Sequence, residues 1–157
     1  MGRKGQKMDR KKKFVRIIVG LIIIIAGIMY LTIGNPRVFI NNHKLGAAIK
    51  EIQSDSVKIN EVIPFKWDAV YTFGPYTSKE DIESVIGFRS PDIKENNISE
   101  GMVHLTFVKD KKVVASVLGY DSNLGYRIDF TSKVAYDDNA IFNVTRADGI
   151  TSLILVQ

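Results

Sequence analysis

The longest apolar run of the chain lies near its N-terminus. From Ile17 to Ile33 no residue is charged, and Ile, Val and Leu dominate. In a helix that rises about 1.5 Å per residue, the roughly 20 residues from Phe14 to Gly34 span about 30 Å, the thickness of a bilayer's hydrocarbon core. The apolar core of a cleaved signal peptide is shorter, about 7 to 15 residues. The pattern therefore predicts an uncleaved transmembrane signal anchor at residues 17–34.

Charge predicts the orientation of this span. Eight Lys and Arg residues precede it, whereas only Arg37 and Lys44 follow it closely. Basic residues stay preferentially on the cytoplasmic side of a membrane, so residues 1–16 are expected to form a basic cytoplasmic tail. Residues 35–157 then form the extracytoplasmic domain of a single-pass cell-membrane protein, and the lipid bilayer is the expected partner of residues 17–34.

The first helical pattern of the outer domain lies at residues 41–55, NNHKLGAAIKEIQSD. Apolar side chains recur there at the spacing of one helix face, at Leu45, Ala48, Ile49 and Ile52. The side-chain oxygen of Asn41 or Asn42 is expected to cap the first turn of this helix.

An aromatic segment follows at residues 65–88, FKWDAVYTFGPYTSKEDIESVIGF. In an extended strand, alternate side chains point to the same side, and here these are Phe65, Trp67, Ala69, Tyr71 and Phe73. Two interpretations stay open. The aromatic side is either the core of a small domain or a platform that binds a ligand.

A second helix is predicted directly after this strand. Gly74-Pro75 breaks the strand, and Thr77 to Glu80 matches a capping box, in which the two side chains satisfy each other's backbone amides. Ile82, Val85 and Ile86 share one face, and Gly87 is placed to end the helix.

The rest of the chain has the pattern of strands. Residues 102–109 and 112–120 flank a short turn at Asp110-Lys111, as in a hairpin, and Asp148-Gly149 is a favoured hairpin turn. Further alternating segments lie at residues 126–130, 140–146 and 150–156. The predicted fold class is α+β: an N-terminal transmembrane helix, then a small domain of two helices packed on a mostly antiparallel sheet of about five strands.

Composition changes the picture in two ways. The net charge of +5 suggests a nucleic-acid binder, but residues 17–157 carry 14 basic and 16 acidic side chains. A nucleic-acid partner needs basic residues clustered on the folded surface, so none is expected. The chain has no Cys, which is unusual for a small secreted domain in a disulfide-forming compartment and favours a Gram-positive bacterial envelope.

Candidate chemistry is sparse. The two histidines, His43 and His104, have no spacing that suggests a metal site, and no cofactor motif is present. Asp68 follows Trp67 directly, as in clefts that bind or cleave glycans, but a glycosidase needs two carboxyl groups at a defined separation. No catalytic, cofactor-binding or metal-binding residue is therefore assigned.

The aromatic segment resembles a family of small Gram-positive extracytoplasmic proteins, either lipoproteins or proteins with one N-terminal membrane segment. The shared pattern is F-x-W-D-x-x-Y-x-F-x-P-Y-T followed by an acidic helix, found here at Phe65, Trp67, Asp68, Tyr71, Phe73, Pro75, Tyr76 and Thr77. The resemblance extends to a hairpin at ISEGMVHLTFVKDKKVVASVLGY. It implies a membrane-tethered α+β domain, and it supplies no catalytic residue.

These observations lead to a hypothesis of function. The chain is expected to display a non-catalytic binding domain for an envelope protein, a cell-wall polymer or a small peptide. Its predicted ligand contacts are Trp67, Asp68, Tyr71 and Tyr76, because exposed Trp and Tyr are strong anchors of interfaces. Two alternatives stay open: an immunity or inhibitor protein against a wall-active enzyme or toxin, and a hydrolase of wall glycan or peptide.

Overall fold

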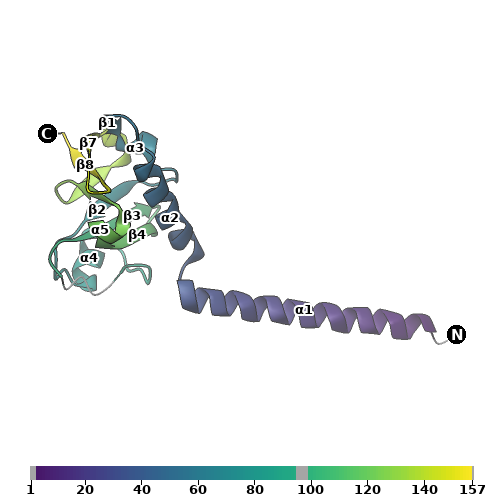
Figure 1. Cartoon of the computed structure of the whole chain (residues 1–157). Coiled ribbons are helices and arrows are strands. Elements are labelled where there is room, and N and C mark those ends of the chain that lie inside the picture. The colour runs from purple at the N-terminus through teal and green to yellow at the C-terminus, as the bar shows by residue number, and fades with distance from the viewer. Residues whose placement is uncertain (1–2, 95–98, 157) are drawn as a thin grey trace. The chain divides into compact units, whose positions relative to one another are not determined.

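The computed structural model describes residues 3–94 and 99–156, and for residues 3–10, 29, 31 and 33 it describes the backbone alone. The chain divides into two compact units, Met1–Pro36 and Arg37–Gln157 (Figure 1). Each unit is described by itself.

The first unit is a single long helix, α1 (Arg3–Ile33). It begins within the basic segment, where Lys and Arg are good helix formers. In the described part of the chain, no helix is both long enough and apolar enough to cross a membrane. The prediction of a transmembrane signal anchor at residues 17–34, and with it a single-pass membrane protein, is wrong. The predicted location of residues 35–157 outside the cell stays a prediction.

Helix α2 (Pro36–Lys50) belongs to the second unit from its second residue onward. The helix starts earlier than predicted, because Pro36 is well suited to a first helical position, where its missing N–H is not needed. Asn41 and Asn42 therefore lie inside the helix and do not cap it. Their side chains instead bond to the backbone of β4 (Lys112–Tyr120), 73 and 74 residues away: Asn41 Nδ2 donates to Val114 O at 2.8 Å, and Asn42 Nδ2 donates to Ser116 O at 2.7 Å.

The aromatic segment forms a shorter strand than the alternation predicts. After β1 (Ser56–Lys58) and the short helix α3 (Ile59–Val62), the chain reaches Trp67 in an irregular conformation, and only Ala69–Thr72 forms strand β2. The five aromatic and apolar side chains do not share one side. Trp67 belongs to one core cluster, whereas Ala69, Tyr71 and Phe73 belong to or pack on another.

Helix α4 (Lys79–Ile86) follows as predicted, with its N-cap shifted by one residue. Ser78, and not Thr77, is the cap, and its Oγ accepts a hydrogen bond from the backbone N–H of Asp81 at 3.1 Å. Gly87 ends the helix in the left-handed region at φ 82°, where a residue without Cβ is not strained.

The hairpin of β3 (Met102–Lys109) and β4 is confirmed at the predicted boundaries. Asp110 and Lys111 form its turn at φ 50° and 54°, the two positive values that a tight hairpin turn requires. The later elements are α5 (Asp121–Leu124), β5 (Tyr126–Asp129), β6 (Lys133–Ala135), a 3₁₀ turn η1 (Tyr136–Asp138), β7 (Ile141–Ala147) and β8 (Ile150–Leu155).

The α+β class is confirmed, but the single sheet of about five strands is wrong. The strands of the described residues form two sheets of four, in the orders β1-β7-β8-β5 and β4-β3-β2-β6. Strand β8 pairs antiparallel with β7 and parallel with β5, so the C-terminal strands are not a simple meander.

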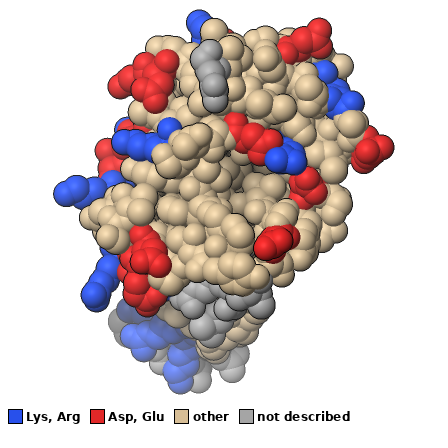
Figure 2. Space-filling view, turned by 90° about the vertical axis from the view of Figure 1, so that its left-hand side faces the viewer, with Lys and Arg blue, Asp and Glu red and all other residues tan. Residues whose placement is uncertain are grey.

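Two hydrophobic clusters hold this unit together. The larger lies between the two sheets and includes Phe107, Trp67, Phe142 and Leu153, with Leu45 from α2. The smaller lies on the other side of the β4-β3-β2-β6 sheet, and α4 supplies Ile82 and Ile86 to it. On the surface in the foreground of Figure 2, acidic and basic side chains are interspersed.

Candidate functional site

Trp67 is almost fully buried, with 3% of its surface exposed. Its ring packs edge-on against Phe107 at 5.7 Å and against Tyr136 at 5.3 Å between ring centroids. Trp67 is therefore a core residue. For this ring, the interpretation of the aromatic segment as core is correct. Trp67 also lines a cavity, so it remains a candidate binding residue.

This cavity, called here the Trp67 cavity, has a volume of about 460 Å³. Its walls come from α3, the segment after it, the end of β3 and η1. The lining residues are Asn60, Ile63, Phe65, Lys66, Trp67, Asp68, Lys109, Tyr136 and Asp137. Aromatic side chains and both signs of charge thus meet in one hollow.

Two lining residues carry buried polar atoms without a hydrogen-bond partner, Trp67 Nε1 and Asn60 Oδ1. The amide nitrogen of Asn60 is held by Asn139 Oδ1 at 3.0 Å and by Tyr136 O at 3.3 Å. These bonds fix the orientation of the Asn60 amide and leave its oxygen unused. A donor and an acceptor are therefore unsatisfied in the same part of the protein, which is rare for buried polar atoms.

Asp68 is fixed at the mouth of the cavity by its neighbours. Its carboxylate forms an ion pair with Lys109 and accepts a hydrogen bond from the backbone N–H of Asp110 at 2.8 Å. The hydrogen bond from Lys109, and then that from Asp110, lower the pKa of this carboxyl group. Asp68 is thus an anion over a wide pH range and has no proton to give as a general acid.

The other two predicted contact residues lie elsewhere. Tyr71 is half-buried in β2, where its ring stacks on Phe73 at 6.3 Å and Lys133 Nζ lies 5.8 Å from its centroid. Tyr76 is 68% exposed, in a turn at φ 64°. Neither residue lines the Trp67 cavity, so the structure brings together only Trp67 and Asp68 of the four.

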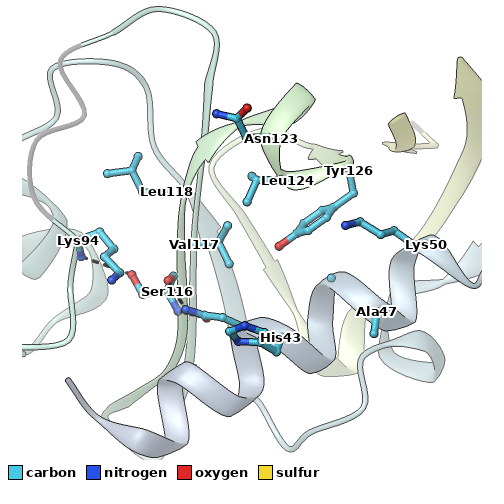
Figure 3. Close-up of a pocket in the computed structure, with 12 residues that line it drawn as sticks. His43, Ala47, Lys50, Lys94, Ser116, Val117, Leu118, Asn123, Leu124 and Tyr126 are labelled. Carbon is cyan, nitrogen blue, oxygen red and sulfur yellow. Dashed lines mark hydrogen bonds between the residues drawn. The ribbon is translucent and has the colours of Figure 1, made fainter. Parts of the chain in front are cut away.

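A second hollow, which the sequence did not indicate, lies between α2, β4 and α5 (Figure 3). This α2–β4 groove has a volume of about 410 Å³. It is lined by Asn42, His43, Gly46, Ala47, Lys50, Lys94, Ser116, Val117, Leu118, Asn123, Leu124 and Tyr126. Its residues come from five separate segments, and none belongs to a recognisable motif.

The histidines serve in different places. His43 lines the α2–β4 groove and its Nδ1 donates to Phe39 O at 2.9 Å, since a carbonyl oxygen can only accept. His104 is buried in β3, and both of its ring nitrogens lack a partner. Within residues 3–94 and 99–156, no group of three His, Asp or Glu side chains is placed to hold a metal ion.

The fold and site together define a two-sheet α+β domain whose hollows include a cavity of mixed charge and a basic groove. Comparison of the chain with models of protein families, with curated proteins and with solved structures gives no match. The resemblance to the Gram-positive family is not tested by these comparisons and stays a prediction.

Proposed function

We propose that residues 37–157 form a non-catalytic binding domain that holds a neutral, hydroxyl-rich ligand such as a glycan in the Trp67 cavity. The observation that carries this proposal is the pair of unsatisfied polar atoms, Trp67 Nε1 and Asn60 Oδ1, in the lining of one cavity. A buried donor or acceptor left unpaired costs about 1–3 kcal/mol. A ligand hydroxyl both donates and accepts, so hydroxyl groups satisfy both atoms once the cavity lining shifts to expose them, since each atom is covered in this structure.

The charges around the cavity favour a neutral ligand. Lys66 and Lys109 are matched by Asp68 and Asp137, so neither a cation nor an anion is selected by the net field. Charged side chains of both signs are strong hydrogen-bond partners for hydroxyl groups. The aromatic walls supply apolar area for the faces of sugar rings.

One observation supports the hydrolase alternative, and two others oppose it. Asp68 and Asp137 do line the same cavity, as two cooperating carboxyl groups would. A glycosidase, however, needs one carboxyl group with a raised pKa to protonate the leaving group, and the pKa of Asp68 is lowered. The burial of Trp67 in the core also counts against an open catalytic cleft. Binding is therefore the better-supported function.

The proposal is tested by titrating the full chain with chitotriose, a soluble neutral oligosaccharide. Trp67 is the chain's only tryptophan, so its fluorescence reports directly on the cavity, and a saturable change is expected. Calorimetry then compares the wild type with Trp67→Phe, which keeps an aromatic ring and removes the N–H. Loss of a hydrogen bond of about 1.5 kcal/mol lowers the affinity about tenfold.

Tyr76→Ala is the matched control, since it removes an exposed aromatic ring outside the cavity. It should bind chitotriose as the wild type does. Circular dichroism confirms that each variant is folded. The proposal fails if no saturable binding occurs, or if folded Trp67→Phe binds as tightly as the wild type.

A further inference from the structure

We propose that the α2–β4 groove is a second, independent site, which binds the C-terminal end of an extended peptide. Three features of the groove carry this inference: free backbone groups at the edge of a sheet, a basic lining, and apolar side chains between them. Each of these features recognises a different part of such a peptide.

The edge of the sheet is the first feature. Strand β4 is the outermost strand of its sheet, and its outward backbone groups are covered only in part by α2. Asn42 uses both ends of its amide on Ser116: Nδ2 donates to Ser116 O at 2.7 Å, and Oδ1 accepts from Ser116 N–H at 2.9 Å. These bonds show that the backbone N–H and C=O of Ser116 point away from β3.

The backbone N–H and C=O of Leu118, two residues after Ser116, point in the same outward direction. Backbone groups in a strand alternate in direction, so the N–H and C=O of Leu118 also point outward, and Leu118 lines the groove. Its cross-strand partner His104 agrees with this register, because His104 O accepts from Phe73 N–H on the opposite side of β3. Asn41 and Asn42 of α2 bond to the backbone of Val114 and Ser116. The outward N–H and C=O of Leu118 are therefore available to pair with an added strand.

Charge is the second feature. Lys50 and Lys94 line the groove, and none of the described lining residues is acidic. Within the described part of the chain, neither ammonium group has an ion-pair partner. The stem of Lys50 lies close over the backbone of Gly125: a Cβ added there would be 2.7 Å from Lys50 Cε. Figure 3 shows the Lys50 ammonium beside Tyr126. Figure 3 shows Lys94 at the opposite end of the groove from Lys50, so either lysine, one at a time, can pair with a terminal carboxylate, which is the part of a peptide that an ammonium group selects.

Two further side chains, Tyr126 and His43, complete the polar lining. Burial raises the pKa of Tyr126 to about 12, so its hydroxyl keeps its proton and donates to an anion. Figure 3 shows this hydroxyl directed into the groove. Because His43 Nδ1 donates to Phe39 O, the second ring nitrogen, Nε2, is left to bond with the peptide. Gly46 makes this arrangement possible, since a Cβ there would lie 3.2 Å from Tyr126 Cε1.

The third feature is the apolar surface. Ala47, Val117, Leu118 and Leu124 line the groove beside the polar groups. They suit the side chains of a short apolar sequence before the carboxylate, since burying apolar area contributes about 25 cal/mol per Å². The inferred ligand is therefore a peptide with apolar C-terminal residues and a free carboxylate.

The test uses the full chain and one matched pair of probes, acetyl-Ala-Leu-Leu with a free carboxylate and the same peptide as its C-terminal amide. Binding is followed by NMR through the backbone amide resonances. The free acid is expected to shift the resonances of Leu118 and Asn123 in a saturable manner. The double substitution Lys50→Gln and Lys94→Gln should weaken this binding about tenfold or more, which corresponds to about 1.4 kcal/mol.

Two control variants show whether the peptide binds in this groove. Lys112→Gln removes an exposed charge at the other end of β4 and should leave the affinity unchanged. Trp67→Phe should also leave it unchanged, so failure of the Trp67 cavity would not affect this result. Equal binding of the amide peptide would overturn the role of the carboxylate. Binding of acetate or citrate at Leu118 without binding of the peptide would overturn the peptide and show a site for small acids.

Discussion

The two faces of the β4-β3-β2-β6 sheet are buried to the same degree but differ in chemistry. The face toward the second sheet is apolar and carries Leu105 and Phe107 of β3. The face toward α4 carries His104 and Thr106 of β3 and Ser116 of β4, all of which are at most 1% exposed. The same strand therefore contributes to an apolar core on one side and to a buried polar row on the other.

This difference separates two sources of stability. On the apolar face, each side chain stabilises the fold by leaving water and by close packing. On the polar face, burial costs free energy unless hydrogen bonds replace those to water. Within the described residues, His104 and Thr106 lack such bonds, whereas Ser116 Oγ accepts one from the backbone N–H of Lys94 at 3.4 Å. Removing an unbonded polar group should therefore stabilise the protein, whereas removing an apolar side chain or a bonded hydroxyl should destabilise it.

The largest effect is expected on the apolar face. Phe107 is fully buried and packs edge-on against Phe65 at 5.4 Å and Trp67 at 5.7 Å. Phe107→Ala should lower the free energy of unfolding by about 3–5 kcal/mol, because it removes buried area and leaves a cavity. Urea denaturation measures this change. A loss below about 1 kcal/mol would mean that this face is not the main core.

The second prediction concerns the acid stability of the polar face. Burial lowers the pKa of His104 from 6.5 to about 4. In the unfolded state, His104 binds a proton below pH 6.5. In the folded state, it binds one only near and below pH 4. Stability contributed by neutral His104 is therefore complete above pH 6.5 and is lost as the pH falls toward 4. The full loss is about 3 kcal/mol.

Urea denaturation at a series of pH values measures this loss. His104→Asn is the reference, because it keeps a polar side chain and cannot titrate in this range. The difference in stability between the wild type and this variant should change across the window, while carboxyl groups contribute equally to both. A difference that does not vary with pH would show that His104 is accessible to protons in the folded state.

The third prediction has the opposite sign. Thr106 is fully buried, and its hydroxyl has no partner among the described residues. Thr106→Val keeps the branched shape and removes the unsatisfied oxygen, so the variant should be about 1 kcal/mol more stable than the wild type. Thermal unfolding measures the change. A destabilised Thr106→Val would indicate that the hydroxyl has a partner, such as a buried water.

Local patterns predicted the parts of the fold that depend on neighbouring residues. The β3–β4 hairpin was predicted with its boundaries because the turn at Asp110-Lys111 and the alternation lie within one short segment. Helix α4 was also predicted, with an error of one residue at its cap. The apolar run near the N-terminus was misjudged as a membrane span, although it does form one long helix with the basic residues before it.

Long-range pairing was not predicted, because alternation identifies a strand and does not name its partner. Nothing in residues 150–155 indicates parallel pairing with β5. The same limit explains the sites. Trp67 and Asp68 were found because their residue types are unusual together. The α2–β4 groove was missed because its residues are ordinary, and the adjacent Asn41 and Asn42, the one available signal, were interpreted as helix caps.

The smallest effect tests the bonded member of the polar row. Ser116 is fully buried like Thr106, its cross-strand neighbour, but its hydroxyl accepts the Lys94 N–H. Ser116→Ala should lower the free energy of unfolding by about 0.5–1 kcal/mol, since that N–H loses its partner. Paired with Thr106→Val, it compares a bonded and an unbonded hydroxyl on adjacent strands. If Ser116→Ala also stabilised the protein, the long 3.4 Å contact would contribute nothing to stability. Burial of all three polar side chains, His104, Thr106 and Ser116, would then lower the stability of the fold.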